Sequence, residues 1–352
     1  MKLGIIGLPQ SGKTTLFNAL TRGNKPTTAS AGRIEVHTAV VDVPDPRVDK
    51  LSAMFKPRKT IYAKVTYADI AGLEGGAAKS GISGQLLNQL TQMDGFLLVV
   101  RAFANDNVPH PAGSVDARRD AESMLGELLL NDLIAVERKL ERLVEERKKG
   151  GTDKVLNERQ TALFNRLHKA LNEGIPLRKL DFNAEEAREL ASFGLLTRKP
   201  ILTVFNLGEG DPAPAIELDH PSVCLMGKLE MEIAQLDPMD ANLFLKEYGI
   251  EELSLSRMIK LSYDLLHLQS FFTVGEDEVR AWTVQRGAPA VEAAGAIHTD
   301  LQRGFVRAEV VAYEDLISLG GMAEAKAKGK LRLEGKEYPV KDGDIMHVRF
   351  NL

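Results

Sequence analysis

Residues 3–14 read Leu-Gly-Ile-Ile-Gly-Leu-Pro-Gln-Ser-Gly-Lys-Thr, and this stretch decides the fold class. The apolar run at 3–6 is typical of a short strand, and 13–20 is predicted to be a helix because its apolar residues share one side. Gly7 and Gly12 let the backbone close around a phosphate chain, and the helix adds the positive end of its dipole. The pattern therefore predicts a P-loop that binds a nucleotide.

The polar residues of this predicted P-loop have expected roles. Lys13 is expected to reach the β and γ phosphates as a point charge, and the Thr14 hydroxyl is expected to bind Mg²⁺. The nucleotide-binding residues predicted in this segment are Pro9, Gln10, Ser11, Gly12, Lys13, Thr14 and Thr15.

A second element follows the strand predicted at 61–68, which leads into Asp69-Ile70-Ala71-Gly72. Asp69 is expected to hold Mg²⁺ through water, and the Gly72 amide is expected to meet the γ-phosphate. The next residue is Leu73, where many small GTPases carry the glutamine that orients the attacking water. Leucine cannot hydrogen-bond water, so we expect slow catalysis, with Lys13, Gly72 and Leu73 at the catalytic positions.

Base selection is assigned to the end of the strand predicted at 200–206, which reads Asn206-Leu207-Gly208-Glu209. GTPases carry Asn-Lys-x-Asp here, and the aspartate accepts hydrogen bonds from guanine. Leu207 and Glu209 depart from that pattern, and an asparagine such as Asn206 can pair with the N6 and N7 edge of adenine. We therefore predict that ATP is preferred to GTP, with Met226 and Gly227 completing the nucleotide site.

The remaining chain alternates apolar strands with helical stretches, which predicts a mostly parallel α/β sheet. The predicted strands are 36–43, 61–68, 95–101, 200–206 and 222–226. Between them, Leu129, Leu133, Val136, Leu140 and Leu143 form a heptad seam, and a second run follows Gly150-Gly151. These features predict a P-loop domain at 1–115 and 196–271, an α-helical coiled-coil insertion at 116–195, and a small α+β domain at 272–352.

Composition limits the other possibilities. No apolar run approaches the roughly 20 residues that span a bilayer, so no membrane partner is expected. The single cysteine, Cys224, excludes an internal disulfide and fits a reducing compartment, so a cytoplasmic location is predicted. The net charge of -4 gives no global basic field. Nothing in the sequence demands an oligomer, so a monomer is expected.

The sequence also predicts the location or the contacts of several basic residues. Arg101 is interpreted as a surface arginine at a strand end. Two lysine-containing clusters are candidate contacts to ribosomal RNA phosphates. They consist of Lys139, Arg142, Lys148 and Lys149, and of Lys326, Lys328 and Lys330.

Together these motifs resemble one family, the YchF ATPases of the Obg group of P-loop proteins, over the whole chain. The motifs of the resemblance are Gly7-Leu8-Pro9, Gly12-Lys13, Val43-Pro44-Asp45-Pro46-Arg47, Asp69-Ile70-Ala71-Gly72-Leu73, Gly113-Ser114-Val115-Asp116, Asn206-Leu207-Gly208-Glu209, Glu278-Val279-Arg280-Ala281-Trp282-Thr283, Ile297-His298-Thr299-Asp300 and Asp342-Gly343-Asp344-Ile345-Met346-His347. The resemblance implies a C-terminal TGS domain of β-grasp fold, preference for ATP, and association with the ribosome or its subunits in translation or stress responses. The sequence departs from the family's P-loop at Gln10-Ser11, where Asn-Val is usual, and from its switch I at residues 26–32, where a Pro-Phe-x-Thr segment is usual.

Two alternatives remain open. One is a GTP-specific switch with the same architecture, and the other is a scaffold that holds nucleotide without turnover and binds ribosome or RNA. Replacing Leu207 and Glu209 with Lys and Asp tests the first. The second predicts that Lys13→Ala spares ribosome association.

Overall fold

The computed structural model describes residues 1–23, 36–70, 82, 84–149, 153–247 and 253–351. Its contacts divide the chain into two compact units, which are described separately. The first contains residues 1–39 and 66–255, and the second contains residues 40–65 and 256–352.

The first unit is built on a six-stranded sheet with the order β2-β4-β1-β5-β6-β7. Its strands are β1 (Lys2–Ile6), β2 (Val36–Asp42), β4 (Lys64–Ile70), β5 (Gly95–Ala102), β6 (Ile201–Leu207) and β7 (Ser222–Leu225). β1 pairs in parallel with β4 and β5, and β5-β6 and β6-β7 are also parallel. The predicted parallel α/β sheet is confirmed.

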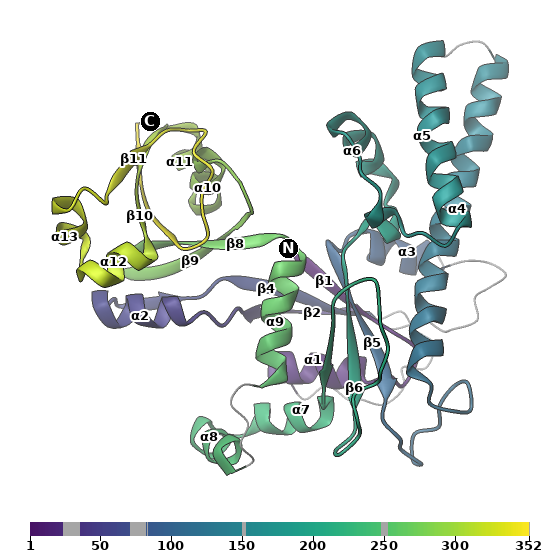
Figure 1. The fold of residues 1–352 in the computed structure, drawn as a ribbon, viewed down its shortest axis with the longest axis horizontal. Coiled ribbons are helices and arrows are strands. Elements are labelled where there is room, and N and C mark those ends of the chain that lie inside the picture. Colours follow the sequence, from purple (N-terminus) through teal and green to yellow (C-terminus); the bar gives the residue numbers. More distant parts are fainter. Residues whose placement is uncertain (24–35, 71–81, 83, 150–152, 248–252, 352) are drawn as a thin grey trace. The chain divides into compact units, whose positions relative to one another are not determined.

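Helices pack on this sheet through apolar residues that are buried, such as Phe17 and Leu86. These helices include α1 (Lys13–Thr21), α3 (Gly84–Thr91) and α7 (Gly227–Gln235); α8 (Pro238–Glu247) follows α7, with Met239 and Leu243 exposed. α1 and α7 pack beside each other (Figure 1). Leu86 and Leu90 of α3 join Phe96 and Phe205 of the sheet in one buried cluster. The P-loop, which joins β1 to α1, therefore begins and ends on elements with buried apolar residues.

The predicted insertion is helical. It comprises α4 (Ala117–Lys149), α5 (Lys154–Asn172), α6 (Ala184–Leu190) and three 3₁₀ turns at Leu177–Lys179, Ala191–Phe193 and Leu196–Arg198. Val136 of the predicted seam is fully buried against Phe164 and Leu167 of α5, whereas Leu156 is 39% exposed. Asn183 and Glu186 form a capping box at the start of α6. Gly150 and Gly151 lie outside the described residues.

A junction joins the insertion to the sheet just before β6. The Asp132 carboxylate on α4 is fully buried and accepts from the Leu196 and Thr197 amides at 2.8 and 2.7 Å and from the Thr197 hydroxyl at 2.6 Å. Lys199 then donates to the backbone carbonyls of Leu90 and Thr91 at 3.2 and 2.6 Å, at the end of α3. Residues 196–199 thus connect two helices to one strand.

The second unit contains a mixed sheet with the order β11-β10-β12-β8-β9-β3. The strands are β3 (Lys59–Ile61), β8 (Leu268–Val274), β9 (Glu278–Gln285), β10 (Phe305–Ala312), β11 (Arg332–Glu334) and β12 (Asp344–Phe350). The helices are α2 (Pro46–Phe55), α9 (Ser254–Leu265), α10 (Ala290–Ile297), α11 (Thr299–Arg303), α12 (Tyr313–Leu319) and α13 (Met322–Ala327). β10 and β12 are antiparallel, whereas β12 and β8 are parallel, as a mixed sheet requires.

Residues 40–65, which the sequence analysis placed with the P-loop, cluster with the C-terminal residues. β3 pairs in parallel with β9, and Arg47 at the start of α2 binds the Asp342 carboxylate at 2.7 Å. β8 also begins at Leu268, before the expected boundary at 272. Residues 40–65 therefore belong to the C-terminal unit, and the β3–β9 pairing and the Arg47–Asp342 ion pair hold them there.

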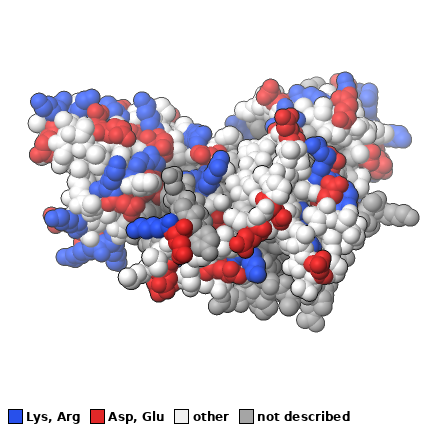
Figure 2. All heavy atoms as spheres, turned by 60° about the horizontal axis from the view of Figure 1, so that its bottom comes forward, with Lys and Arg blue, Asp and Glu red and all other residues white. Residues whose placement is uncertain are grey.

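Acidic and basic side chains are interspersed over the face drawn in Figure 2. Among the residues that the structure describes, none of the helices combines the length and apolarity that a membrane crossing requires.

Candidate nucleotide-binding site

The P-loop runs from the end of β1 to the start of α1, and its backbone has the conformation that the glycine pattern predicts. Gly7 and Gly12 have φ angles of 151° and 95°, and Gln10 also has a positive φ of 63°. A Cβ at Gly7 would lie 2.3 Å from the Val99 carbonyl oxygen, so only glycine allows the loop to pass this close to β5.

Lys13 lies within the curve of this loop. Its Nζ donates to the carbonyl oxygens of Gly7 and Leu8 at 3.0 and 2.8 Å. Burial lowers the pKa of the Lys13 ammonium from 10.5 to about 8, and the charge of Asp69 acts in the opposite direction. The ammonium is therefore incompletely solvated, and an arriving phosphate would supply the counter-charge it lacks.

Thr14 and Asp69, the two predicted metal ligands, are in direct contact. The Thr14 hydroxyl donates to Asp69 Oδ2 at 2.9 Å, because parallel pairing of β1 with β4 places the end of β4 beside the P-loop. Asp69 is 4% exposed, and its Oδ1 has no hydrogen-bond partner among the described residues. Hydroxyl and carboxylate oxygens are the donors that Mg²⁺ prefers, so this pair fits the ion.

Asn206, at the end of β6, joins two loops of the site. Its Nδ2 donates to the Ser11 carbonyl oxygen at 3.1 Å, and its Oδ1 accepts from the Gly227 amide at 2.9 Å. The side chain is 5% exposed, and a Cβ at Gly12 would lie 2.2 Å from Nδ2. Both ends of the amide are thus engaged within the protein. Asn206 therefore joins the P-loop to the start of α7 in this structure, and its pairing with adenine stays a prediction.

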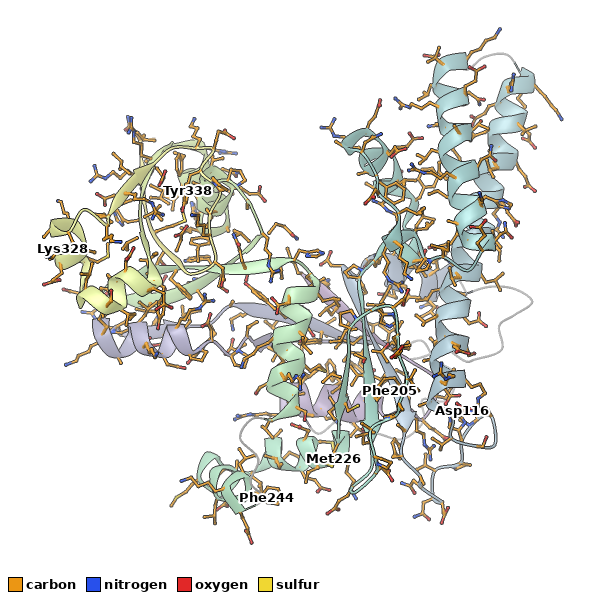
Figure 3. All side chains as sticks on the ribbon, viewed as in Figure 1. Asp116, Phe205, Met226, Phe244, Lys328 and Tyr338 are labelled. Carbon is orange, nitrogen blue, oxygen red and sulfur yellow. The ribbon has the colours of Figure 1, made fainter. Side chains whose placement is uncertain are left out.

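The other residues predicted for base selection lie on the two connections that Asn206 joins. Leu207 is the last residue of β6 and is half-buried, and Glu209 is exposed in the following loop. Met226 precedes α7, which begins at Gly227, and lies beyond the end of the strand that carries Phe205 (Figure 3). The catalytic candidates Gly72 and Leu73 lie outside the described residues.

A hollow beside the P-loop is lined by the predicted site residues Pro9 and Ser11 and by side chains that were not predicted as site residues. Its walls include Leu8, Pro9, Ser11, Val99, Val100, Arg101, His110, Asp120 and Met124. His110 Nε2 lies 2.8 Å from Asp120 Oδ2, and both side chains are almost fully buried. The Ala112 amide donates to His110 Nδ1 at 3.1 Å, which assigns the ring proton to Nε2.

Arg101 was interpreted as a surface arginine, and this is wrong. The residue is 2% exposed, and its Nε donates to the Phe103 carbonyl oxygen at 3.1 Å because the chain after β5 folds back over the guanidinium. Burial lowers the pKa of Arg101. The position alone could have indicated this, since Arg101 lies within β5, a strand that is apolar on both faces and is in the sheet interior.

Comparison with known proteins gives matches over the full length of the chain. A family model described as "50S ribosome-binding GTPase" matches residues 2–139, and the model YchF-GTPase_C, described as "Protein of unknown function (DUF933)", matches residues 268–351. The chain is 41% identical to the "Ribosome-binding ATPase YchF" of Bacillus subtilis, over 99% of both chains. It is also 41% identical to the protein of that name from Escherichia coli O157:H7, over 100% of this chain and 99% of the relative. The solved Schizosaccharomyces pombe YchF GTPase is 31% identical and superposes with a TM-score of 0.83 over 99% of this chain and 97% of its own.

Proposed function

The chain belongs to the YchF family, and from this membership we propose that it is a Mg²⁺-dependent P-loop nucleotide hydrolase that prefers ATP to GTP. The observation that carries the proposal is the P-loop itself, with Lys13 inside its curve and the Thr14–Asp69 pair at its end. Relatives named as ribosome-binding ATPases support the further proposal of a slow switch that associates with the ribosome in the cytoplasm.

Phosphate binding follows from the charges and amides of the loop. The P-loop amides and the start of α1 favour an anion, and the Lys13 ammonium would exchange its two carbonyl contacts for phosphate oxygens. Thr14 and Asp69 would hold Mg²⁺, which supplies neutralisation of the phosphate charge when bound. Asp69 Oδ1, buried without a partner among the described residues, is the atom that supports this assignment most directly.

Preference for ATP is proposed from the loop after β6. Leu207 replaces the lysine whose stem flanks guanine in GTPases, and Glu209 places its carboxylate one methylene further out than aspartate does. Asn206 keeps the connecting role within the protein, so discrimination falls to Leu207, Glu209 and the backbone near Met226.

Ribosome association is proposed from the relatives' names, with RNA phosphates as the contact chemistry. Lys148 and Lys149 at the end of α4 are exposed, as are Lys326 and Lys328 in the second unit. Lys139 is less suited, since its Nζ donates to Gln160 Oε1 at 3.0 Å and lies 6.0 Å from the centre of the Phe164 ring. The protein is proposed to act as a monomer.

The first test is a titration of the purified protein with fluorescent ATP and GTP analogues in the presence of Mg²⁺, followed by phosphate release with and without ribosomes. Tighter ATP binding and turnover above background are expected, and Lys13→Ala should abolish both. Tighter GTP binding would overturn the base assignment while leaving the P-loop assignment intact. Binding without turnover, together with ribosome co-sedimentation of Lys13→Ala, would favour the scaffold instead.

A further inference from the structure

Asp211 lies in the loop that follows Asn206 and has no role in the proposed site. Its carboxylate accepts a hydrogen bond from the backbone of that loop. The Gly208 amide donates to Asp211 Oδ2 at 3.0 Å. The Asp211 amide in turn donates to the Gly208 carbonyl oxygen at 3.3 Å. Gly208 is thereby held through both its backbone polar groups by one residue.

Neighbouring atoms also leave no room for a side chain at Gly208. A Cβ at Gly208 would lie 2.4 Å from Asp211 Oδ2 and 3.3 Å from Phe103 Cβ. Phe103 is in turn held by Arg101, whose guanidinium lies 4.5 Å from the Phe103 ring centre. Because Arg101 is 2% exposed, this support belongs to the interior of the unit and does not depend on a surface contact.

Gly208 lies between Leu207 and Glu209, the two residues to which base discrimination is assigned. Fixing its amide and carbonyl fixes the peptide planes on both sides, and so fixes the directions in which these two side chains leave the backbone. The other end of the segment is already fixed, because Asn206 is bonded to Ser11 and Gly227.

We propose that Asp211 is a positioning residue for nucleotide base selection, acting through Gly208 on Leu207 and Glu209. The proposal rests on the proposed nucleotide-binding function. It predicts a loss confined to the base-dependent part of binding, because the hydrogen bonds of Asp211 within the described residues are to Gly208 and none is to the P-loop. A residue that merely stabilised the fold would lower the affinity for every ligand together.

The test compares three ligands on the full-length protein with Mg²⁺ present: non-hydrolysable ATP, non-hydrolysable GTP and inorganic tripolyphosphate. Asp211→Ala is expected to weaken ATP binding by roughly tenfold, the equivalent of one hydrogen bond to a charged group. The ratio of ATP to GTP affinity should fall toward one, and tripolyphosphate affinity should stay unchanged. Glu217→Gln is the matched control, since Glu217 is an exposed carboxylate on the same connection between β6 and β7.

A second variant reaches the same contact from the other side. Gly208→Ala places a Cβ against Asp211 Oδ2 and should displace that carboxylate, giving the same loss of selectivity. In the double variant the clash with Asp211 is gone together with the hydrogen bond, and only the 3.3 Å approach to Phe103 Cβ remains, so we expect a loss close to that of Asp211→Ala alone and well below the sum of the two single losses.

The outcomes separate the inference from the function on which it rests. An unchanged ATP-to-GTP ratio in Asp211→Ala, or an equal loss for all three ligands, overturns the positioning role and leaves nucleotide binding intact. Additive losses in the double variant also count against it. A wild-type protein that binds ATP no better than tripolyphosphate would refute the proposed function, and the inference with it.

Discussion

The charge on Lys13 gives nucleotide binding a pH dependence that can be worked out from the structure. Burial lowers the pKa of this ammonium to about 8 in the free protein. A bound triphosphate favours the charged form and returns the pKa toward its ordinary value. Below the pKa of the free protein, Lys13 is protonated in both the free and the nucleotide-bound protein, so the affinity does not change with pH there. It falls as pH rises between the two values, because binding then requires proton uptake.

The size of the effect follows from the pKa of about 8. At about pH 9.5 only about one free molecule in thirty carries the Lys13 proton, whereas the bound form keeps it. Between about pH 7.5 and 9.5 the dissociation constant should therefore rise roughly 25-fold, or about 2 kcal/mol. Ionisation of the nucleotide itself contributes little to this pH dependence, since phosphate groups with a pKa of about 6 are almost fully ionised over this range.

The assay is a fluorescence or calorimetric titration with a non-hydrolysable ATP analogue, repeated across the range, with circular dichroism confirming that the protein stays folded. Lys13→Arg is the matched control, because a guanidinium keeps its charge and should give a flat profile. A wild-type profile as flat as that of Lys13→Arg would refute the argument, since Lys13 would then be fully charged in the free protein.

Three further predictions follow from contacts described above. Thr14→Val should remove most of the Mg²⁺-dependent part of nucleotide affinity, measured by titration with and without the ion; an unchanged Mg²⁺ dependence would contradict the assignment. Asp132→Ala leaves buried amides unpaired and should lower the free energy of unfolding by about 3 kcal/mol in urea titrations, against about 1 kcal/mol for the exposed helix cap Asp153→Ala. Equal losses would show that the junction is not special. Asn206→Ala should weaken ATP and GTP binding alike by roughly tenfold, because both of its amide contacts position loops; a change in the ATP-to-GTP ratio would support direct base reading.

The parts of the site that the sequence predicts well are local in the chain or lie at the ends of adjacent strands. The P-loop is contained in residues 7–14, and Asp69 meets Thr14 because β4 is the parallel neighbour of β1. The capping box of Asn183 and Glu186 is equally local, because the two residues are three positions apart at the start of α6.

The features that escaped the sequence depend on contacts between distant segments. Asn206 meets Ser11 and Gly227 only because β6 ends beside the P-loop, and no periodicity in either segment reports that distance. The burial of Arg101 is a more local case, because the chain folds back at Phe103, two residues later, over the guanidinium. Pairing of β3 with β9 likewise joins segments more distant than any local pattern covers.

The junction at Asp132 also bears on how the chain closes during folding. β5 ends at Ala102 and β6 begins at Ile201, so pairing them closes a loop of about a hundred residues, with an entropic cost that grows with the logarithm of length. If α4 and α5 pair first, we expect them to replace much of that loop with a stiff span, because their shared buried cluster is local to the insertion. Asp132 then holds the amides of Leu196 and Thr197 a few residues ahead of β6. On this account the insertion lowers the entropic cost of pairing β6 with β5, although about a hundred residues separate the two strands.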